Sequence, residues 1–388
     1  MKKIFVIAAS AFICAIALSG CNRAEYNLYT NLSKGDFVYD KNYAVNLIEG
    51  GAFGGLKADK AENTQDFTGK TKSWFGIINT DLTATLVISD NFNEPATLEN
   101  FNLLCGEVGE VLDDMNYSLS ATVEGASIYN FNNAAAVAEV ELTRTAYTVL
   151  AMTQRIYEFT EGYYNPAVYY SVQAYGFGGA EAYPQTAEDL PKDGDIEKYN
   201  ILADAFMDIR LKEKDGKFYA VKPDTTVEVN GETLSLKLDL GGIGKGYATD
   251  VVSGLIDKYG FKYGYFNFGG SSIVYKSHFR EGNYSLAITD PRNLGGYYMI
   301  TPIANLSVST SGDNAQYYII DGVRYCHVIN PKTGKPVQTG VMSATILGGS
   351  AAEDDAYTTA IMAMGRDKAA EFIKTKLTDR RVVFSCGV

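Results

Sequence analysis

Hydrophobic and polar residues follow both strand and helix periods along this chain. Residues 80–89 alternate with the two-residue period of a half-buried strand, and residues 98–116 have helical spacing. Residues 136–160 predict one long amphipathic helix. The pattern therefore indicates a fold in which strands and helices are mixed throughout.

The middle of the chain predicts a hairpin that leads into a helix. Residues 216–240 have the pattern of a strand meander, with Asn230-Gly231 as a tight hairpin turn. Residues 249–260 then have helical spacing that ends at Gly260. We therefore expect the intervening glycine-rich stretch to form a loop that opens a helix, with free amides facing whatever the loop holds.

That stretch, DLGGIGKGYATD at residues 239–250, fits neither common nucleotide-binding glycine pattern. Gly244 and Lys245 are followed by Gly246, where a P-loop has Ser or Thr. The glycines still allow close backbone approach to a ligand, and Lys245 supplies a cation. An ordinary strand-to-helix turn explains the stretch as well, so it assigns no function by itself.

The N-terminus has the pattern of a secretory signal. Two lysines precede an apolar run over residues 4–18, and LSGC ends at Cys21 like the lipobox of a bacterial lipoprotein. We expect residues 1–20 to be removed, Cys21 to be lipidated, and residues 21–66, which lack periodicity, to be a tether and lead-in. The protein would then be extracytoplasmic, on the periplasmic side of a bacterial membrane. Plain secretion with an unmodified cysteine remains the alternative.

Composition and charge narrow the classes of partner. The chain has 388 residues, of which 46% are hydrophobic, so it can bury a large core. Its formal net charge of −12 argues against nucleic acid as a partner. Beyond the signal only Cys105, Cys326 and Cys386 remain, a spacing that indicates neither a zinc site nor a disulfide framework, although one disulfide is possible.

Three later stretches are dense in polar residues. Residues 307–318 carry SVSTSGDNAQYY ahead of an expected helix, residues 325–336 carry YCHVINPKTGKP, and residues 350–365 carry SAAEDDAYTTAIMAMG, whose pattern predicts a helix. Taken singly, these stretches are explained by helix caps, a turn and acidic residues at a helix start.

Taken together and in this order, the motifs resemble those of the FAD:protein FMN transferase (ApbE) family. The motifs that carry the resemblance are LSATVEGASIYNFN (119–132), TEGYYNPAVYYSVQAYGFGG (160–179), DLGGIGKGYATD, STSGDN, HVINPKTGKP and EDDAYTTAIMAMG. The resemblance covers roughly residues 67–385, which we therefore expect to form a flavin transferase domain.

The resemblance implies the fold and the reaction. The fold would be α+β, with mixed and largely antiparallel sheets and packed helices in two joined lobes around a flavin cleft. The reaction would be Mg2+-dependent transfer of FMN from FAD to a threonine hydroxyl of an acceptor flavoprotein, such as a subunit of a membrane redox pump, with release of AMP. Membrane association would be through the lipid anchor alone.

The resemblance also assigns the metal and phosphate residues. Asp239 and Lys245 would contact FAD, while the Gly242 carbonyl, Asp355 and Thr359 would bind Mg2+. Independently, Asp355 and Thr359 are one helical turn apart, so both can face one ion. An oxygen-only set of ligands is what Mg2+ prefers.

The resemblance also assigns a catalytic histidine and the residues that contact the flavin. His327 would be the catalytic base, because an imidazole can take a proton from threonine at neutral pH; a structural histidine is the alternative. Tyr164, Asn165 and the backbone near Val328 would lie at the flavin. His278 has no such motif, and we expect it at the surface.

One departure from the family pattern bears on function. Thr122 stands where the family commonly has an aromatic residue that stacks on flavin, so FAD would be held loosely. Two other functions stay open from the sequence: a flavin-binding lipoprotein without transfer activity, and an FAD pyrophosphatase that releases FMN and AMP.

Overall fold

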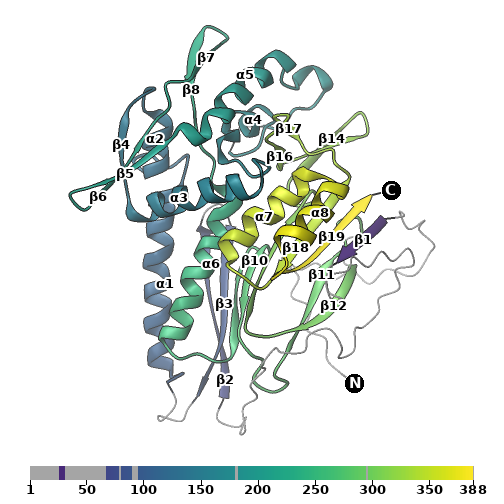
Figure 1. Ribbon diagram of the computed structural model, residues 1–388. Coiled ribbons are helices and arrows are strands. Elements are labelled where there is room, and N and C mark those ends of the chain that lie inside the picture. The colour runs from purple at the N-terminus through teal and green to yellow at the C-terminus, as the bar shows by residue number, and fades with distance from the viewer. Residues whose placement is uncertain are drawn as a thin grey trace.

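An eight-stranded antiparallel sheet runs through the lower part of the molecule in Figure 1. The computed structural model describes residues 26–30, 67–77, 80–89, 95–179, 182–293 and 296–387. In spatial order the strands are β1 (Tyr26–Thr30), β19 (Arg381–Gly387), β18 (Val341–Leu347), β13 (Leu306–Gly312), β10 (Ser272–Tyr275), β9 (Gly264–Phe268), β3 (Thr80–Ser89) and β2 (Phe67–Ile77). Every residue of β18 is buried, as expected for a central strand covered on both faces.

Helices cover one face of this sheet and a hairpin covers the other. The helices are α1 (Leu98–Leu119), α6 (Gly241–Lys258) and α7 (Ala351–Met364), with α8 (Arg366–Lys376) directly after α7. Strands β11 (Tyr284–Thr289) and β12 (Tyr297–Ile303) pack their apolar side chains against β10, β13, β18 and β19. The sheet is therefore the middle layer of three.

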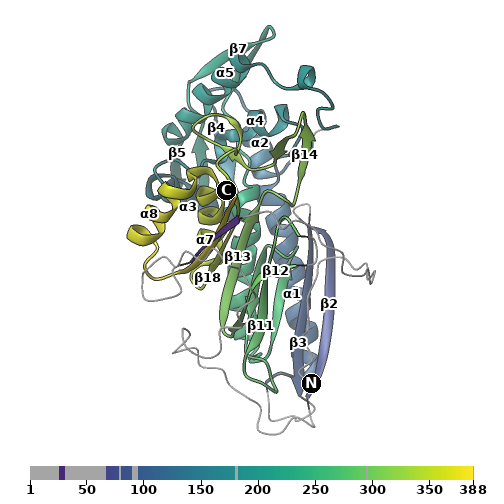
Figure 2. The ribbon, with the colours of Figure 1, turned by 90° about the vertical axis from the view of Figure 1, so that its right-hand side faces the viewer.

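The upper part of the molecule in Figures 1 and 2 consists of short helices and small sheets. The helices are α2 (Ser127–Asn133), α3 (Arg144–Phe159), α4 (Tyr169–Ala174) and α5 (Asp193–Asp204), with 3-10 turns at Pro166–Val168, Ala187–Asp189 and Ala205–Asp208. The small sheets pair β4 (Glu139–Leu142) and β5 (Arg210–Lys214) with β6 (Lys217–Val221), β7 (Thr226–Val229) with β8 (Glu232–Ser235), β14 (Tyr317–Ile320) with β15 (Val323–Cys326), and β16 (Ile329–Asn330) with β17 (Lys335–Pro336).

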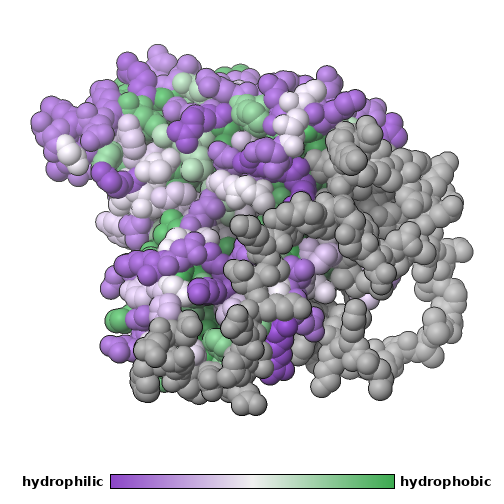
Figure 3. All heavy atoms as spheres, turned by 60° about the horizontal axis from the view of Figure 1, so that its bottom comes forward, coloured by the Kyte–Doolittle hydropathy of each residue, from purple (hydrophilic) through white to green (hydrophobic). Residues whose placement is uncertain are grey.

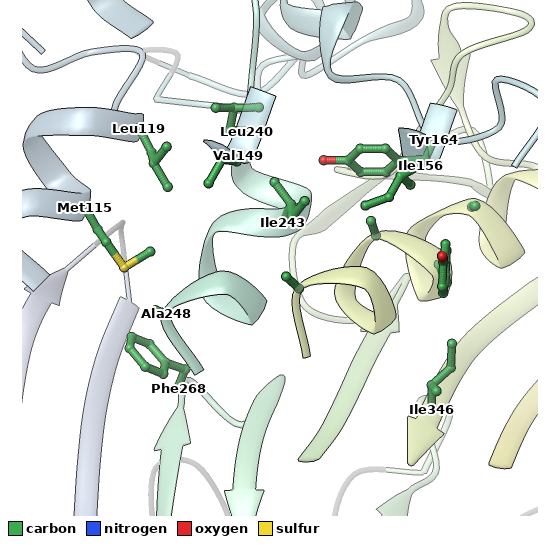
Figure 4. Packing of buried hydrophobic residues seen from close by; sticks show 14 of the residues in the cluster. Met115, Leu119, Val149, Ile156, Tyr164, Leu240, Ile243, Ala248, Phe268 and Ile346 are labelled. Carbon is green, nitrogen blue, oxygen red and sulfur yellow. The ribbon is translucent and has the colours of Figure 1, made fainter. Parts of the chain in front are cut away.

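One hydrophobic core joins the two parts. Figure 4 shows Met115 and Leu119 of α1, Val149 of α3 and Ile243 of α6 gathered in it. Phe268 of β9 belongs to the same core, so it runs from the large sheet to the upper helices without interruption. The structure confirms the α+β class with antiparallel sheets.

Two of the expected elements are confirmed and one is wrong in part. Residues 80–89 form β3 and residues 98–116 lie in α1. Residues 136–160 do not form one helix, because β4 precedes α3 and Thr143 begins the helix by accepting a hydrogen bond from the Ala146 amide. The reason is tertiary: β4 pairs with β6, which lies far along the chain.

The helix expected after residues 307–318 is also wrong. These residues form β13 and the start of β14, with a turn between them. The hydroxyls of β13 make tertiary hydrogen bonds instead of capping a helix; Ser309, for example, donates to the Ala351 carbonyl oxygen. The Asn230-Gly231 turn is confirmed, and both of its residues have positive φ.

The segment expected as a tether contributes one strand to the large sheet. Within the expected tether, β1 forms an edge strand beside β19, whereas the signal segment and Cys21 lie outside the described residues. Cys105, Cys326 and Cys386 are all free.

Among the described residues no helix has the length and apolarity needed to span a bilayer. Hydrophilic side chains predominate among the described atoms on the face seen in Figure 3.

Candidate active site

The glycine-rich stretch forms the first turns of α6 rather than a loop before it. The helix begins at Gly241, directly after Asp239 and Leu240. Asp239 Oδ1 accepts a hydrogen bond from the Gly241 amide at 2.8 Å, and the Asp239 amide donates to the Pro166 carbonyl oxygen at 2.7 Å. One turn on, Lys245 Nζ donates to the Gly241 carbonyl oxygen at 3.1 Å. A carboxylate and an ammonium group are thus fixed at one helix N-terminus.

Two glycines of this stretch lie at close contacts, and one of them, Gly246, leaves no room for a side chain. A Cβ atom at Gly242 would lie 3.2 Å from the Tyr164 ring and 3.5 Å from Thr359 Oγ1. A Cβ atom at Gly246 would lie 2.2 Å from the backbone oxygen of Ala351, a distance no side chain can adopt. The glycines therefore let α6 lie directly against α7 and the Tyr164 segment.

Helix α7 brings Asp355 and Thr359 to this contact. Asp355 is 2% exposed, and its Oδ2 accepts a hydrogen bond from the Gly246 amide at 3.0 Å. Lys245 Nζ lies 3.9 Å from the same oxygen. Burial raises the pKa of Asp355, and Lys245 opposes that rise only in part. The charged form of this carboxylate is therefore only partly compensated by Lys245 and the Gly246 amide.

Thr359 belongs to a cluster of hydroxyl groups beside Asp355. Its Oγ1 donates to the Asp355 carbonyl oxygen at 3.1 Å and lies 3.3 Å from Ser311 Oγ. Ser311, on β13, also lies 2.9 Å from Thr358 Oγ1. Ser311 was not among the expected site residues, although the hydroxyl density of STSGDN marked its position.

Tyr164 and Asn165 lie against the start of α6. Figure 4 shows the Tyr164 ring beside this helix, and its buried hydroxyl has no hydrogen-bond partner. Burial, with Asp355 and Asp239 adding to it, raises the pKa of Tyr164. Asn165 is buried as well, but its amide caps the Pro166 turn by accepting from the Ala167 amide and donates to the Ala203 carbonyl oxygen.

His327 lies on the segment after β15. Its Nδ1 is 3.4 Å from the Gln316 carbonyl oxygen, and its ring lies edge-on to Phe177 at 6.4 Å. Burial and the nearby Lys245 lower the pKa of His327, which keeps the imidazole neutral at pH 7. Val328, next to it, is buried and its carbonyl oxygen accepts from the Val337 amide.

The second histidine lies elsewhere. His278 is half-buried rather than at the surface, and its ring packs edge-on against Tyr284 at 5.0 Å. Its Nδ1 accepts a hydrogen bond from the Glu281 amide, and burial lowers its pKa. These contacts explain it as a structural residue.

The motifs at residues 119–132 and 160–179 also lie near the start of α6. A Cβ atom at Gly178 would lie 3.6 Å from Asp239 Oδ2, and one at Gly179 would lie 4.0 Å from the Thr122 methyl group. Thr122 itself is exposed and lies within hydrogen-bond distance of Ser120 Oγ. Residues of three motifs, which span more than a hundred residues from Thr122 to Asp239, therefore lie close together near the start of α6.

The model of the ApbE family matches residues 79–384, which is most of the chain. The chain belongs to the ApbE family. The matched range contains all of the expected site residues except Cys21.

Curated relatives carry the name FAD:protein FMN transferase. The protein from Vibrio cholerae is 27% identical over 269 residues, which cover 68% of this chain and 73% of the relative. The protein from Treponema pallidum is 25% identical over 299 residues and covers 73% of this chain and 79% of the relative.

Solved ApbE structures share the fold. The apo form of the Pseudomonas stutzeri flavinyl transferase ApbE superposes with a TM-score of 0.66 at 20% identity and covers 82% of this chain and 91% of that one. The ApbE protein of Thermotoga maritima superposes with a TM-score of 0.65 at 24% identity and covers 82% and 94%.

Proposed function

We propose that this protein transfers FMN from FAD to a threonine hydroxyl of an acceptor flavoprotein and releases AMP. Family membership and the name of the curated relatives support flavin transfer. The observation that carries the proposal is the junction of α6 and α7, where the buried Asp355 carboxylate faces Lys245 and the Gly246 amide. Such a junction provides charge on both sides of a phosphate site.

The residues present fit a magnesium ion. Asp355 is a buried carboxylate whose pKa is raised by burial, and Thr359 presents a hydroxyl one turn away. Gly242 leaves the space beside Thr359 open because it has no side chain. We infer that Asp355, Thr359 and the Gly242 carbonyl hold Mg2+, an oxygen-only set. When bound, Mg2+ would neutralise charge on the phosphates of FAD.

The chain's own residues would do the rest of the chemistry. Lys245 and the amides at the start of α6 would hold the pyrophosphate, with Asp239 at the same helix end. Tyr164, Asn165 and the backbone near Val328 would lie along the flavin. His327, neutral at pH 7, would take the proton of the acceptor hydroxyl. The threonine oxygen bonds to the FMN phosphorus, the bond from that phosphorus to the bridging oxygen breaks, and AMP leaves with that oxygen.

The test is a transfer assay. The protein is incubated with FAD, Mg2+ and candidate acceptor domains, and acceptor mass is measured. An increase equal to FMN, with one AMP formed per acceptor, is the expected result. Free FMN and AMP without any acceptor mass shift, across several acceptors, would show an FAD pyrophosphatase instead. Bound FAD that stays intact would indicate a flavin-binding protein without transfer activity.

We also propose that the protein is a lipoprotein anchored on the periplasmic side of a bacterial membrane. The support is the sequence of residues 1–21, with its apolar run and LSGC at Cys21. Cells fed a palmitate analogue should incorporate label into the wild-type protein and none into Cys21→Ala. Label retained by the variant would contradict the anchor.

A further inference from the structure

The Tyr164 hydroxyl is a polar group that the folded protein leaves without a partner. The side chain is only 4% exposed, and its oxygen has no hydrogen-bond partner in the described part of the chain. A buried hydroxyl without a hydrogen bond lowers the stability of the fold, so native proteins rarely keep one. A group of this kind is explained by a bound ligand, an ion or water, or by strain that serves function.

The hydroxyl lies at the start of α6. A Cβ atom at Gly242 would lie 3.2 Å from Tyr164 Cε2, which is the ring carbon next to the one that carries the hydroxyl. Figure 4 shows the oxygen on the side of the ring that faces Leu240 and Ile243, the residues that flank the first two glycines of the helix. The unpartnered group therefore points toward the first turn of α6.

This turn contributes a second donor without a partner, the amide of Gly242. The amides on either side of it are bonded, that of Gly241 to Asp239 Oδ1 and that of Ile243 to the Leu240 carbonyl oxygen. Among the described residues the Gly242 amide has no such bond, as is usual in the N-terminal turn of a helix. Two unused donors are thus present at one helix end, where the helix dipole also favours an anion.

The surroundings of the hydroxyl make it a donor that an anion can reach. Burial, with Asp355 and Asp239 adding to it, raises the pKa of Tyr164, so the phenol keeps its proton at pH 7. Lys245 is folded back over this turn, with its Nζ 3.1 Å from the Gly241 carbonyl oxygen and 3.9 Å from Asp355 Oδ2. Because an ammonium on a flexible stem changes partners readily, a phosphate that enters here can draw it away and take its place.

We propose that the Tyr164 hydroxyl and the Gly242 amide together bind one phosphate oxygen of FAD. This inference rests on the proposed function, in which the Tyr164 ring lies along the flavin and its hydroxyl has no role. The hydroxyl is unsatisfied in the free protein and gains its acceptor when the phosphate binds. It therefore lowers the stability of the free protein and raises the affinity for phosphorylated ligands.

The variant Tyr164→Phe removes the hydroxyl and keeps the ring, so it tests both effects. In EDTA and without ligand, it should unfold at a higher temperature than wild type, because the unsatisfied hydroxyl is gone. With Mg2+ present, it should bind FAD at least about tenfold more weakly, as expected for the loss of a hydrogen bond to a charged group. Scanning and titration calorimetry of the full-length protein in detergent measure the two quantities.

Smaller ligands identify the part of FAD that the hydroxyl contacts. Riboflavin carries the flavin ring without a phosphate, so Tyr164→Phe and wild type should bind it equally well. FMN and AMP each carry one phosphate of the FAD pyrophosphate, and at least one of them should bind about tenfold more weakly to the variant. The ligand that loses affinity shows which of the two phosphates lies at the hydroxyl.

The matched control is Tyr259→Phe, at the other end of α6, whose hydroxyl donates to Glu107 Oε2 at 2.8 Å. It should bind every ligand as wild type does and should not unfold at a higher temperature, since it loses a hydrogen bond that is made.

Three results would overturn the phosphate contact and leave the transfer function standing. One is an unchanged affinity of Tyr164→Phe for FAD, FMN and AMP, and another is an equal loss for riboflavin. The third is a loss of Mg2+ affinity without any nucleotide, which would assign the hydroxyl to the metal. If wild type binds neither FAD nor FMN, the proposed function fails as well.

Discussion

At the scale of single residues, the Asp355 carboxylate is proposed to bind the metal, but its burial in the ionised form lowers the stability of the folded protein. Burial raises its pKa in the folded protein, so the folded state favours the protonated carboxyl group. The protein therefore loses stability as the pH rises through that pKa and Asp355 ionises. Asp355→Asn cannot ionise, so the metal-free variant should be more stable than wild type at pH 7. Its FAD turnover should fall at least about a hundredfold, because charge on the transferring phosphoryl group is no longer neutralised.

Two measurements check this prediction. Thermal unfolding in EDTA should give a higher midpoint for Asp355→Asn than for wild type, and added Mg2+ should raise the midpoint of wild type alone. The exposed Asp113→Asn, on α1, is the control and should change neither quantity. Wild-type turnover in Asp355→Asn, or in EDTA, would rule out Asp355 as the magnesium ligand.

His327 should set the acid side of the pH profile. Its pKa lies below the usual value of 6.5, and a general base must be neutral to accept a proton. Transfer to threonine should therefore decline as the pH falls below that lowered pKa. His327→Gln should lose this decline and lower transfer by about a hundredfold to ten-thousandfold, while the dissociation constant of FAD stays near that of wild type.

The matched control for this prediction is His278→Gln, since His278 packs on Tyr284 and touches no site residue described above. Plots of kcat/KM against pH for the acceptor would show whether the acid limb is present in the control and absent in His327→Gln. An unchanged limb in His327→Gln would assign the proton transfer to another group.

Only some of the contacts in this site can be predicted from the sequence. The spacing of Asp355 and Thr359 in the chain already indicates one helix face, because the helical period decides it. Ser311 could not be connected to Thr359, since the contact depends on β13 lying under α7. The unpartnered Tyr164 hydroxyl is likewise a property of the assembled core.

At the scale of elements, the contact between α6 and α7 depends on Gly246. Gly246→Ala would put a Cβ atom 2.2 Å from the Ala351 backbone oxygen, so the helices must separate. We expect a loss of about 1–3 kcal/mol in the free energy of unfolding, as for overpacked cores. Gly254→Ala, in the same helix and in open space, should instead gain about 0.5–1 kcal/mol.

Urea unfolding of the two variants measures this difference. Because Asp355 accepts its hydrogen bond from the Gly246 amide, Gly246→Ala should also lower FAD turnover, whereas Gly254→Ala should keep it. Equal stability of the two variants would mean that α7 can move away from α6 without cost.

Elements defined by local signals were predictable, and those defined by distant partners were not. The long helix α1 and the Asn230-Gly231 turn carry their periodicity and turn chemistry in the chain itself. The sequence predicts helix where β4 lies, because the pairing with β6 that makes it a strand involves residues far along the chain. The glycine stretch is predicted as a loop, but it forms the first turns of α6, and Gly246 is required by the packing of α6 against α7.

At the scale of the whole molecule, β1 closes one edge of the large sheet. It pairs with β19 over residues 26–30, so removing it exposes the backbone groups of a long edge strand. Deletion of residues 1–66 should cost at least about 2 kcal/mol relative to deletion of residues 1–25, since ladder hydrogen bonds contribute about 1 kcal/mol each. Urea unfolding and light scattering should show the shorter protein as less stable and more prone to aggregate. Equal behaviour would mean that β1 adds nothing to the sheet.

If Cys21 carries a lipid, as proposed above, the position of β1 limits how far the protein can move from the bilayer. Tyr26 is five residues after Cys21, and an extended chain spans at most about 3.6 Å per residue, so a lipid on Cys21 would hold the sheet edge within about 18 Å of the surface. Such confinement would give membrane-bound acceptors a higher effective concentration than acceptors that are free in the surrounding compartment. Twenty Gly/Ser residues inserted before Tyr26 should relax that preference, while transfer to acceptors in detergent solution stays the same.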